Sequence, residues 1–113
     1  FSDSKLYIPE YLKEAKRIID NNLESDISIN DICNKIFISK PTLISNFKLY
    51  YGDTPHQYRT KRKSQLACIM LKSSNLDIAS IANSLGFNDS FAFSHWFKKI
   101  NGVSPNKYRH SNK

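Results

Sequence analysis

The feature that most constrains this chain is an internal repeat relating residues fifty positions apart. Six residues of the first copy recur unchanged in the second: Phe47, Lys48, Gly52, Pro55, Tyr58 and Arg59 return as Phe97, Lys98, Gly102, Pro105, Tyr108 and Arg109. At a spacing of forty-nine, Ile29, Ile32 and Asn34 return as Ile78, Ile81 and Asn83. Units of about 32 residues are too short to be whole domains, so the repeat indicates two copies of one supersecondary unit.

Each copy has the pattern of two short helices joined by a tight turn. In the first copy, Ser28 with Asp31 resembles a capping box, and Ser39 caps a second helix that ends at Gly52. The expected inward residues of that second helix are Leu43, Phe47 and Tyr50. Two short helices around such a turn predict a helix-turn-helix.

The second copy follows the same plan. Asp77 caps a helix that ends at Gly86, and Asn88 or Asp89 caps the next helix, which stops at Gly102. Its expected inward residues are Phe93, Phe97 and Ile100, and Ser104-Pro105 opens a short last helix.

Two more helices complete the expected fold. Residues 9–22 are amphipathic, and a helix from Pro55 to about Ser73 carries Tyr58, Leu66, Ile69 and Met70 as apolar positions among basic side chains. We therefore predict an all-α fold of about seven helices, a homeodomain-like tandem repeat. Its helix-turn-helix subdomains span residues 8–53 and 75–110, and residues 54–74 form the linker helix.

Charge is concentrated in the repeated part of the chain. Residues 1–31 hold four Lys and Arg against seven Asp and Glu, whereas residues 32–113 hold thirteen against three. A basic segment of this kind attracts polyanions such as nucleic acid. Cys33 and Cys68 stand alone in apolar patterns, as is typical of reduced core cysteines in a cytosolic protein. The chain starts at Phe1 with no leader and has no run near the 20 or so apolar residues of a membrane span, so we expect a soluble piece of a longer protein.

The residues of the second copy resemble the DNA-binding domain of AraC/XylS-type bacterial transcription regulators. The resemblance rests on Ile81-Ala82, Gly86-Phe87, Phe93, Phe97-Lys98, Gly102, Ser104-Pro105 and Tyr108-Arg109. It covers about residues 8–109 and implies two recognition helices in successive major-groove segments, about one helical turn of DNA apart.

The resemblance also implies which residues face the groove. In the first recognition helix they are Lys40, Pro41, Ile44, Ser45 and Lys48, and in the second they are Ser90, Phe91, Ser94, His95 and Lys98. Because Ile44 and Ser45 cannot make bidentate contacts with purines, we expect weaker base discrimination by the first unit. The expected phosphate contacts are Ser28, Ser39, Lys61, Arg62 and Asn88.

Plainer explanations exist for several of these residues. Ile44 and Phe91 could belong to the core, and His95 could be an ordinary surface histidine. Trp96 is expected to pack rather than stack on a base. Arg59 and Arg109 could pair with helix ends or carboxylates instead of DNA.

The sequence therefore predicts sequence-specific binding of double-stranded DNA, at an asymmetric site of about two turns, by a cytoplasmic, nucleoid-associated bacterial regulator. We expect no enzyme activity, cofactor, metal or membrane partner, a monomeric state for these residues, and a possible contact with RNA polymerase. The alternative is a protein-interaction module that docks on an acidic partner and has only nonspecific affinity for polyanions.

Overall fold

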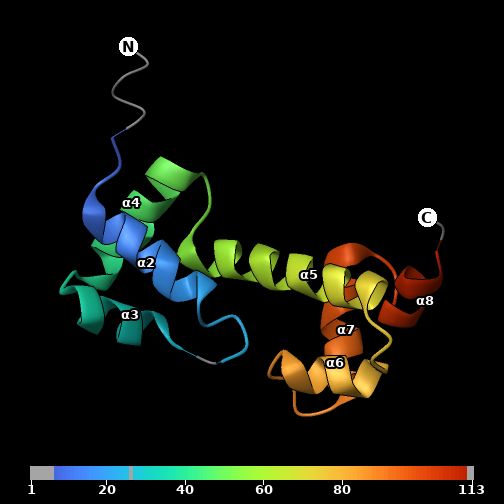
Figure 1. The fold of residues 1–113 in the computed structure, drawn as a ribbon. Helices are drawn as coiled ribbons and strands as arrows, with labels where there is room; N and C mark the ends of the chain where they lie inside the picture. The colour runs from blue at the N-terminus through green and yellow to red at the C-terminus, as the bar shows by residue number, and fades with distance from the viewer. Residues whose placement is uncertain (1–6, 26, 112–113) are drawn as a thin grey trace. The chain divides into compact units, whose positions relative to one another are not determined.

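The computed structural model describes residues 7–25 and 27–111, and within them it contains seven helices and no strand. The helices are α2 (Glu10–Asp20), α3 (Ile29–Ile36), α4 (Lys40–Tyr51), α5 (Pro55–Ser73), α6 (Ile78–Ser84), α7 (Ser90–Asn101) and α8 (Pro105–His110) (Figure 1). The all-α prediction is confirmed. The chain divides into two compact units, Phe1–Thr60 and Lys61–Lys113, and the boundary between them falls within α5.

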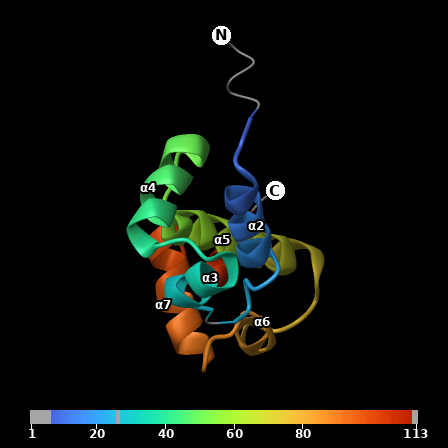
Figure 2. The ribbon, with the colours of Figure 1, turned by 90° about the vertical axis from the view of Figure 1, so that its left-hand side faces the viewer.

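In the first unit, α2, α3 and α4 contact one another (Figure 2). Its core consists of the buried side chains of Leu12, Ala15, Ile19, Leu23, Ile32, Cys33, Leu43 and Phe47. The ring of Phe47 lies 4.7 Å from that of Tyr51 and 5.7 Å from that of Tyr58 on α5. The aromatic residue of the repeat thus ties α4 to the start of α5.

In the second unit, α7 contacts both α6 and α8. The buried cluster contains Ala67, Leu71, Ile81, Ala82, Leu85, Phe93 and Phe97. Phe97 stands against Tyr108 with ring centroids 5.6 Å apart, as Phe47 does against Tyr58 fifty residues earlier. The repeat in the sequence is therefore a repeat in packing.

The helix starts are capped largely as the sequence predicts. The Ser28 hydroxyl accepts from the Asp31 amide at 3.0 Å while the Asp31 carboxylate accepts from the Ser28 amide at 3.1 Å, which completes the capping box. Ser39, Asp77 and Ser104 cap α4, α6 and α8. At α7 the cap is Asp89 and not Asn88, because the Asp89 carboxylate accepts from the Ala92 amide at 2.8 Å.

Two predicted inward positions are wrong, and one expected apolar position of α5 is exposed as well. Tyr50 and Ile100 are exposed near the ends of α4 and α7, and Ile69 on α5 is 60% exposed. Besides its first residue, Pro55, the buried residues of α5 are Ser64, Ala67 and Leu71. Ser64, Ala67 and Leu71 are spaced three and four residues apart, so they lie on one face of the helix. Two of them have small side chains, which a search for large apolar residues does not identify.

Candidate nucleic-acid interface

Helix α4 presents the predicted residues of the first unit on its exposed side. Leu43 and Phe47 hold the helix against the core, which turns Lys40, Pro41, Ser45 and Lys48 to the solvent. Ile44 is half-buried, so it is neither a full core residue nor a fully available contact. The helix begins where the Ser39 hydroxyl accepts from the Thr42 amide and ends at Gly52, whose φ of 88° favours glycine.

Helix α7 does the same in the second unit, with Phe93 and Phe97 buried. Phe91, His95 and Lys98 are exposed, whereas Ser90 and Ser94 are half-buried. Phe91 is 81% exposed, which rules out the core role that the sequence left open for it. The burial pattern of residues 91–100 repeats that of residues 41–50 position by position. The two equivalent helices, α4 and α7, therefore expose equivalent faces.

The exposed face of α7 has two hollows, and His95 lines both of them. One hollow of about 320 Å³ is lined by His95, Lys98 and Lys99. Another, of about 190 Å³, is lined by Phe91, Ser94, His95, Lys98 and Ser104. This face therefore combines an aromatic ring, an imidazole and two ammonium groups, which suits contact with base edges and phosphates. Lys99 was missed by the sequence prediction, although its place beside Lys98 was a signal.

The predicted phosphate contacts differ in what already surrounds them. At Ser28 the capping box occupies two of the amide donors that a phosphate would need. Lys61 is exposed, and Arg62 donates to the Gln65 side chain at 3.2 Å. The next residue, Lys63, lies with its ammonium 4.5 Å from the centre of the Phe87 ring, which turns it toward the aromatic cluster of the second unit.

The aromatic cluster of Phe87, Phe93 and Trp96 packs α7 against the rest of the second unit. Trp96 is half-buried, and its ring lies 5.1 Å from that of Phe87 and 6.2 Å from that of Phe93. The expected packing role of Trp96 is confirmed. An aromatic layer of this kind fixes the rotation of α7, and with it the direction in which His95 and Lys98 point.

Arg59 and Arg109, which occupy equivalent positions in the two copies of the repeat, make similar contacts with backbone carbonyl groups. Arg109 donates to the carbonyl oxygens of Leu71 and Ser74 at the end of α5. Arg59 donates to the Asn22 carbonyl, just beyond α2, at 3.5 Å. Both guanidinium groups stabilise helix C-termini, which supports the helix-end interpretation of the two arginines.

Electrostatics at α6 favour an ionised cap. Hydrogen bonds from the side chain and the amide of Ser80 lower the pKa of Asp77, and the positive charge of Arg109 contributes a smaller lowering. Asp77 and Asp89 put negative charge at the starts of α6 and α7. Phosphate contact by those helix starts is therefore less favourable than contact by the lysines of α7.

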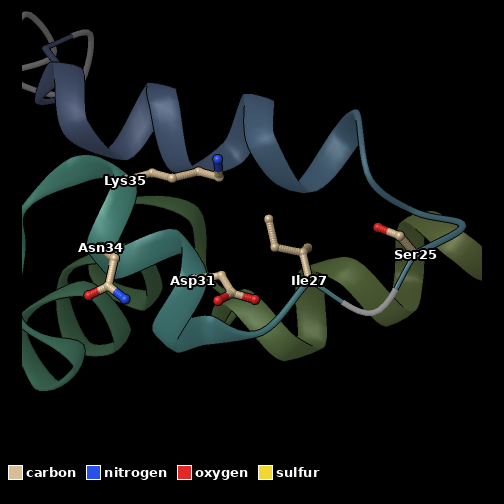
Figure 3. A pocket seen from close by; sticks show the side chains of 5 residues that line it. All are labelled: Ser25, Ile27, Asp31, Asn34 and Lys35. Carbon is tan, nitrogen blue, oxygen red and sulfur yellow. The ribbon is translucent and has the colours of Figure 1, made fainter.

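A different kind of site would need a cluster of catalytic or ligating groups. Within residues 7–25 and 27–111 no group of three or more His, Cys, Asp or Glu side chains is placed to hold a metal ion. The first unit has a hollow of about 590 Å³. It is lined by Ser25, Ile27, Asp31, Asn34 and Lys35, whose side chains are labelled in Figure 3. Its one carboxylate, Asp31, is engaged in the capping box, so these residues do not form a nucleophile and base pair. No helix among the described residues is long and apolar enough to span a membrane.

The chain is similar to a known protein family and to known regulatory proteins. A family described as a helix-turn-helix domain matches residues 22–111. The chain is 34% identical over 107 residues to the raffinose operon transcriptional regulatory protein RafR of Pediococcus pentosaceus, covering 95% of this chain and 39% of RafR. It thus spans about two-fifths of the length of the curated relatives that it matches first.

Two solved structures share the fold over most of the chain. The C-terminal domain of AraT, a response regulator from Geobacillus stearothermophilus, has a TM-score of 0.85 at 28% identity, covering 92% of this chain and 87% of that one. A transcriptional regulator of the AraC-type DNA-binding domain-containing proteins from Chromobacterium violaceum has a TM-score of 0.77 at 26% identity, covering 88% and 89%. The fold of this chain is therefore one already seen in solved proteins.

Proposed function

The chain belongs to the AraC family of helix-turn-helix transcription regulators, and from this premise we propose that it binds double-stranded DNA in a sequence-specific way. Helices α4 and α7 enter successive segments of the major groove. The observation that carries the proposal is the repeated burial pattern of these two helices, which exposes the same face of each. A helix with its first turns exposed is the element that reads base edges in the major groove.

In this proposal the first unit contributes Lys40, Pro41, Ile44, Ser45 and Lys48, and the second contributes Ser90, Phe91, Ser94, His95 and Lys98. The exposed imidazole of His95 donates to a guanine acceptor, and the ammonium groups of Lys48 and Lys98 neutralise phosphates. Lys61, Arg62 and Ser39 act as further contacts to the DNA phosphates. The predicted phosphate contacts at Ser28 and Asn88 are weaker, because the capping carboxylates of Asp31 and Asp89 lie at those helix starts. The second unit supplies most of the specificity, because the short side chains and half-buried Ile44 of the first unit offer fewer bonds to bases.

The assignment of residues 8–53, 54–74 and 75–110 to two reading subdomains and a linker helix stays a prediction. So do the monomeric state of these residues, their cytoplasmic and nucleoid location and a contact with RNA polymerase. The relatives are transcription regulators, in keeping with a binding role and no catalysis of its own.

The experiment is selection from a random duplex pool by the 113-residue chain at about 0.15 M salt, followed by sequencing of the bound DNA. Enrichment of two short, unrelated motifs supports the proposal, because the two helices carry different side chains. No enrichment, together with binding that disappears as salt rises, would leave only nonspecific polyanion affinity. That result would favour a protein-interaction module with an acidic partner.

A further inference from the structure

Phe91 is placed where an aromatic side chain has no stabilising role within its own unit. The core side of α7 is filled by Phe93 and Phe97, and Phe91 on the opposite side is 81% exposed. An exposed phenylalanine forgoes the stabilisation that burial of its ring would give. Its value to the protein therefore has to come from a surface that covers it.

The surroundings of Phe91 identify that surface. On a helix, residues four apart share a face, so Phe91 lies beside His95. Together with Ser94, Lys98 and Ser104 they line the hollow of about 190 Å³. Almost all of the surface that lines this hollow is carbon, from the phenyl ring and the aliphatic parts of the other side chains. The hollow therefore suits an apolar group, while the charged ends of the surrounding side chains suit acceptor atoms and phosphates.

Only one major-groove edge presents a carbon group to such a ring. Guanine, cytosine and adenine expose donors and acceptors, whereas thymine adds its 5-methyl group. We infer that Phe91 recognises the 5-methyl group of a thymine, and that the hollow beside the ring receives that methyl group. This inference rests on the proposed DNA binding and adds the identity of one base in the motif of the second unit.

The first unit provides an internal contrast. The position equivalent to Phe91 is occupied by Pro41, which is exposed but lacks an aromatic ring. Ile44, the other apolar candidate of α4, is half-buried and has less surface to offer. Dependence on a thymine methyl group should therefore be strongest in the motif that α7 reads.

The test uses the duplex recovered by selection, labelled with fluorescein, and the full 113-residue chain. Each thymine of the motif assigned to α7 is replaced in turn by deoxyuridine, which removes only the methyl group. At one position the wild-type dissociation constant should rise about fourfold, the equivalent of one buried methyl-sized group. The Phe91→Ala variant should bind the thymine and uracil duplexes equally, which makes the two changes non-additive.

The matched control on the same helix is Lys98→Ala, which should weaken both duplexes and keep the fourfold ratio. Because Phe91 is exposed, the Phe91→Ala variant should keep the thermal midpoint of the wild type. The ratio of the wild-type dissociation constants for the uracil and thymine duplexes tests the inference even without a variant. Uracil tolerated at every position, or a motif without thymine, would overturn the inference and leave specific binding intact. Failure to recover any specific duplex would instead overturn the proposed function, and this inference with it.

Discussion

Arg109 donates from Nε to the carbonyl oxygen of Leu71 across 2.9 Å, and its terminal nitrogen reaches the Ser74 carbonyl at 3.3 Å. These carbonyls lie at the end of α5, where a helix leaves its last acceptors without partners. The half-buried guanidinium therefore fastens α8 to the last turn of α5. It stabilises the unit that contains α7, and we expect it to take no direct part in DNA recognition.

We accordingly expect Arg109→Met to lower the free energy of unfolding by about 1.5 to 3 kcal/mol, the range for hydrogen bonds that involve a charged group. Urea unfolding measures this change. The control is Lys107→Met on the same helix, where the side chain is exposed and the effect should be within about 0.5 kcal/mol. At a temperature where Arg109→Met remains folded, its DNA affinity should match that of the wild type. A large loss of affinity without loss of stability would assign Arg109 to the interface.

Phe37 lies in the left-handed region with φ of 57°, in the turn before α4. The equivalent turn of the second unit has Gly86 with φ of 90°. A side chain costs about 1 to 2 kcal/mol in this region, and the 90% exposed ring of Phe37 has little contact to lose. After the entropy cost of glycine, Phe37→Gly should raise the free energy of unfolding by about 0.5 to 1 kcal/mol.

Gly86→Ala tests the same reasoning in reverse and should destabilise the second unit, with both changes followed by urea unfolding. If Phe37→Gly lowers stability, contacts of the phenyl ring outweigh the backbone strain and the explanation is wrong.

The lowered pKa of Asp77 gives a dependence of stability on pH with a fixed sign. Because the pKa in the folded state lies below the ordinary value of 3.8, the carboxylate stabilises the folded state at pH values above 3.8. This contribution is lost as the pH falls through the folded-state pKa. Asp77→Asn keeps a good cap and removes the titration, so its stability should fall less than that of the wild type between pH 5 and pH 2.

Chemical unfolding at a series of pH values measures the difference between the two proteins. Parallel curves would show that Asp77 titrates alike in the folded and unfolded states.

Lys98 should act on phosphate and carry no sequence information. Lys98→Ala should weaken specific and random duplexes by the same factor and reduce the slope of log K against log salt by about 0.9. Lys13 on α2 is a control, because its ammonium lies 3.4 Å from the Glu10 carboxylate on an exposed helix surface. Lys13→Ala should leave the salt slope unchanged. A loss confined to one DNA sequence would place Lys98 on a base instead.

Most of the fold could be predicted because both copies of the repeat carry the same signals for the starts and ends of helices. Caps such as Ser39 and Asp77 and the helix stops at Gly52 and Gly102 are local signals, and local signals survive in a single sequence. The burial of α5 could not be predicted in the same way. Apolar residues occur on more than one of its sides, so the choice of Ala67 over Ile69 for the core depends on packing against other helices.

Only part of the candidate site could be predicted from the sequence. The groove-facing residues of α4 and α7 were predicted from the family resemblance, and the burial of Phe93 and Phe97 agrees with the predicted orientation of α7. The exposure of Phe91 could not be decided from the sequence, because a phenylalanine at the edge of an apolar stripe is compatible with either side. Nor could the placement of Lys63 over Phe87, which joins residues far apart in the chain.

We propose that α4 and α7 read separate DNA segments, and this is tested by comparing the motifs selected by the wild type and by His95→Ala. We predict that the variant loses preference at one position of one motif, at a cost of about 1 to 3 kcal/mol, while the other motif is unchanged. His56→Ala, an exposed histidine outside both helices, should select the wild-type motifs. Identical motifs from His95→Ala and the wild type, or loss of both motifs together, would contradict the claim.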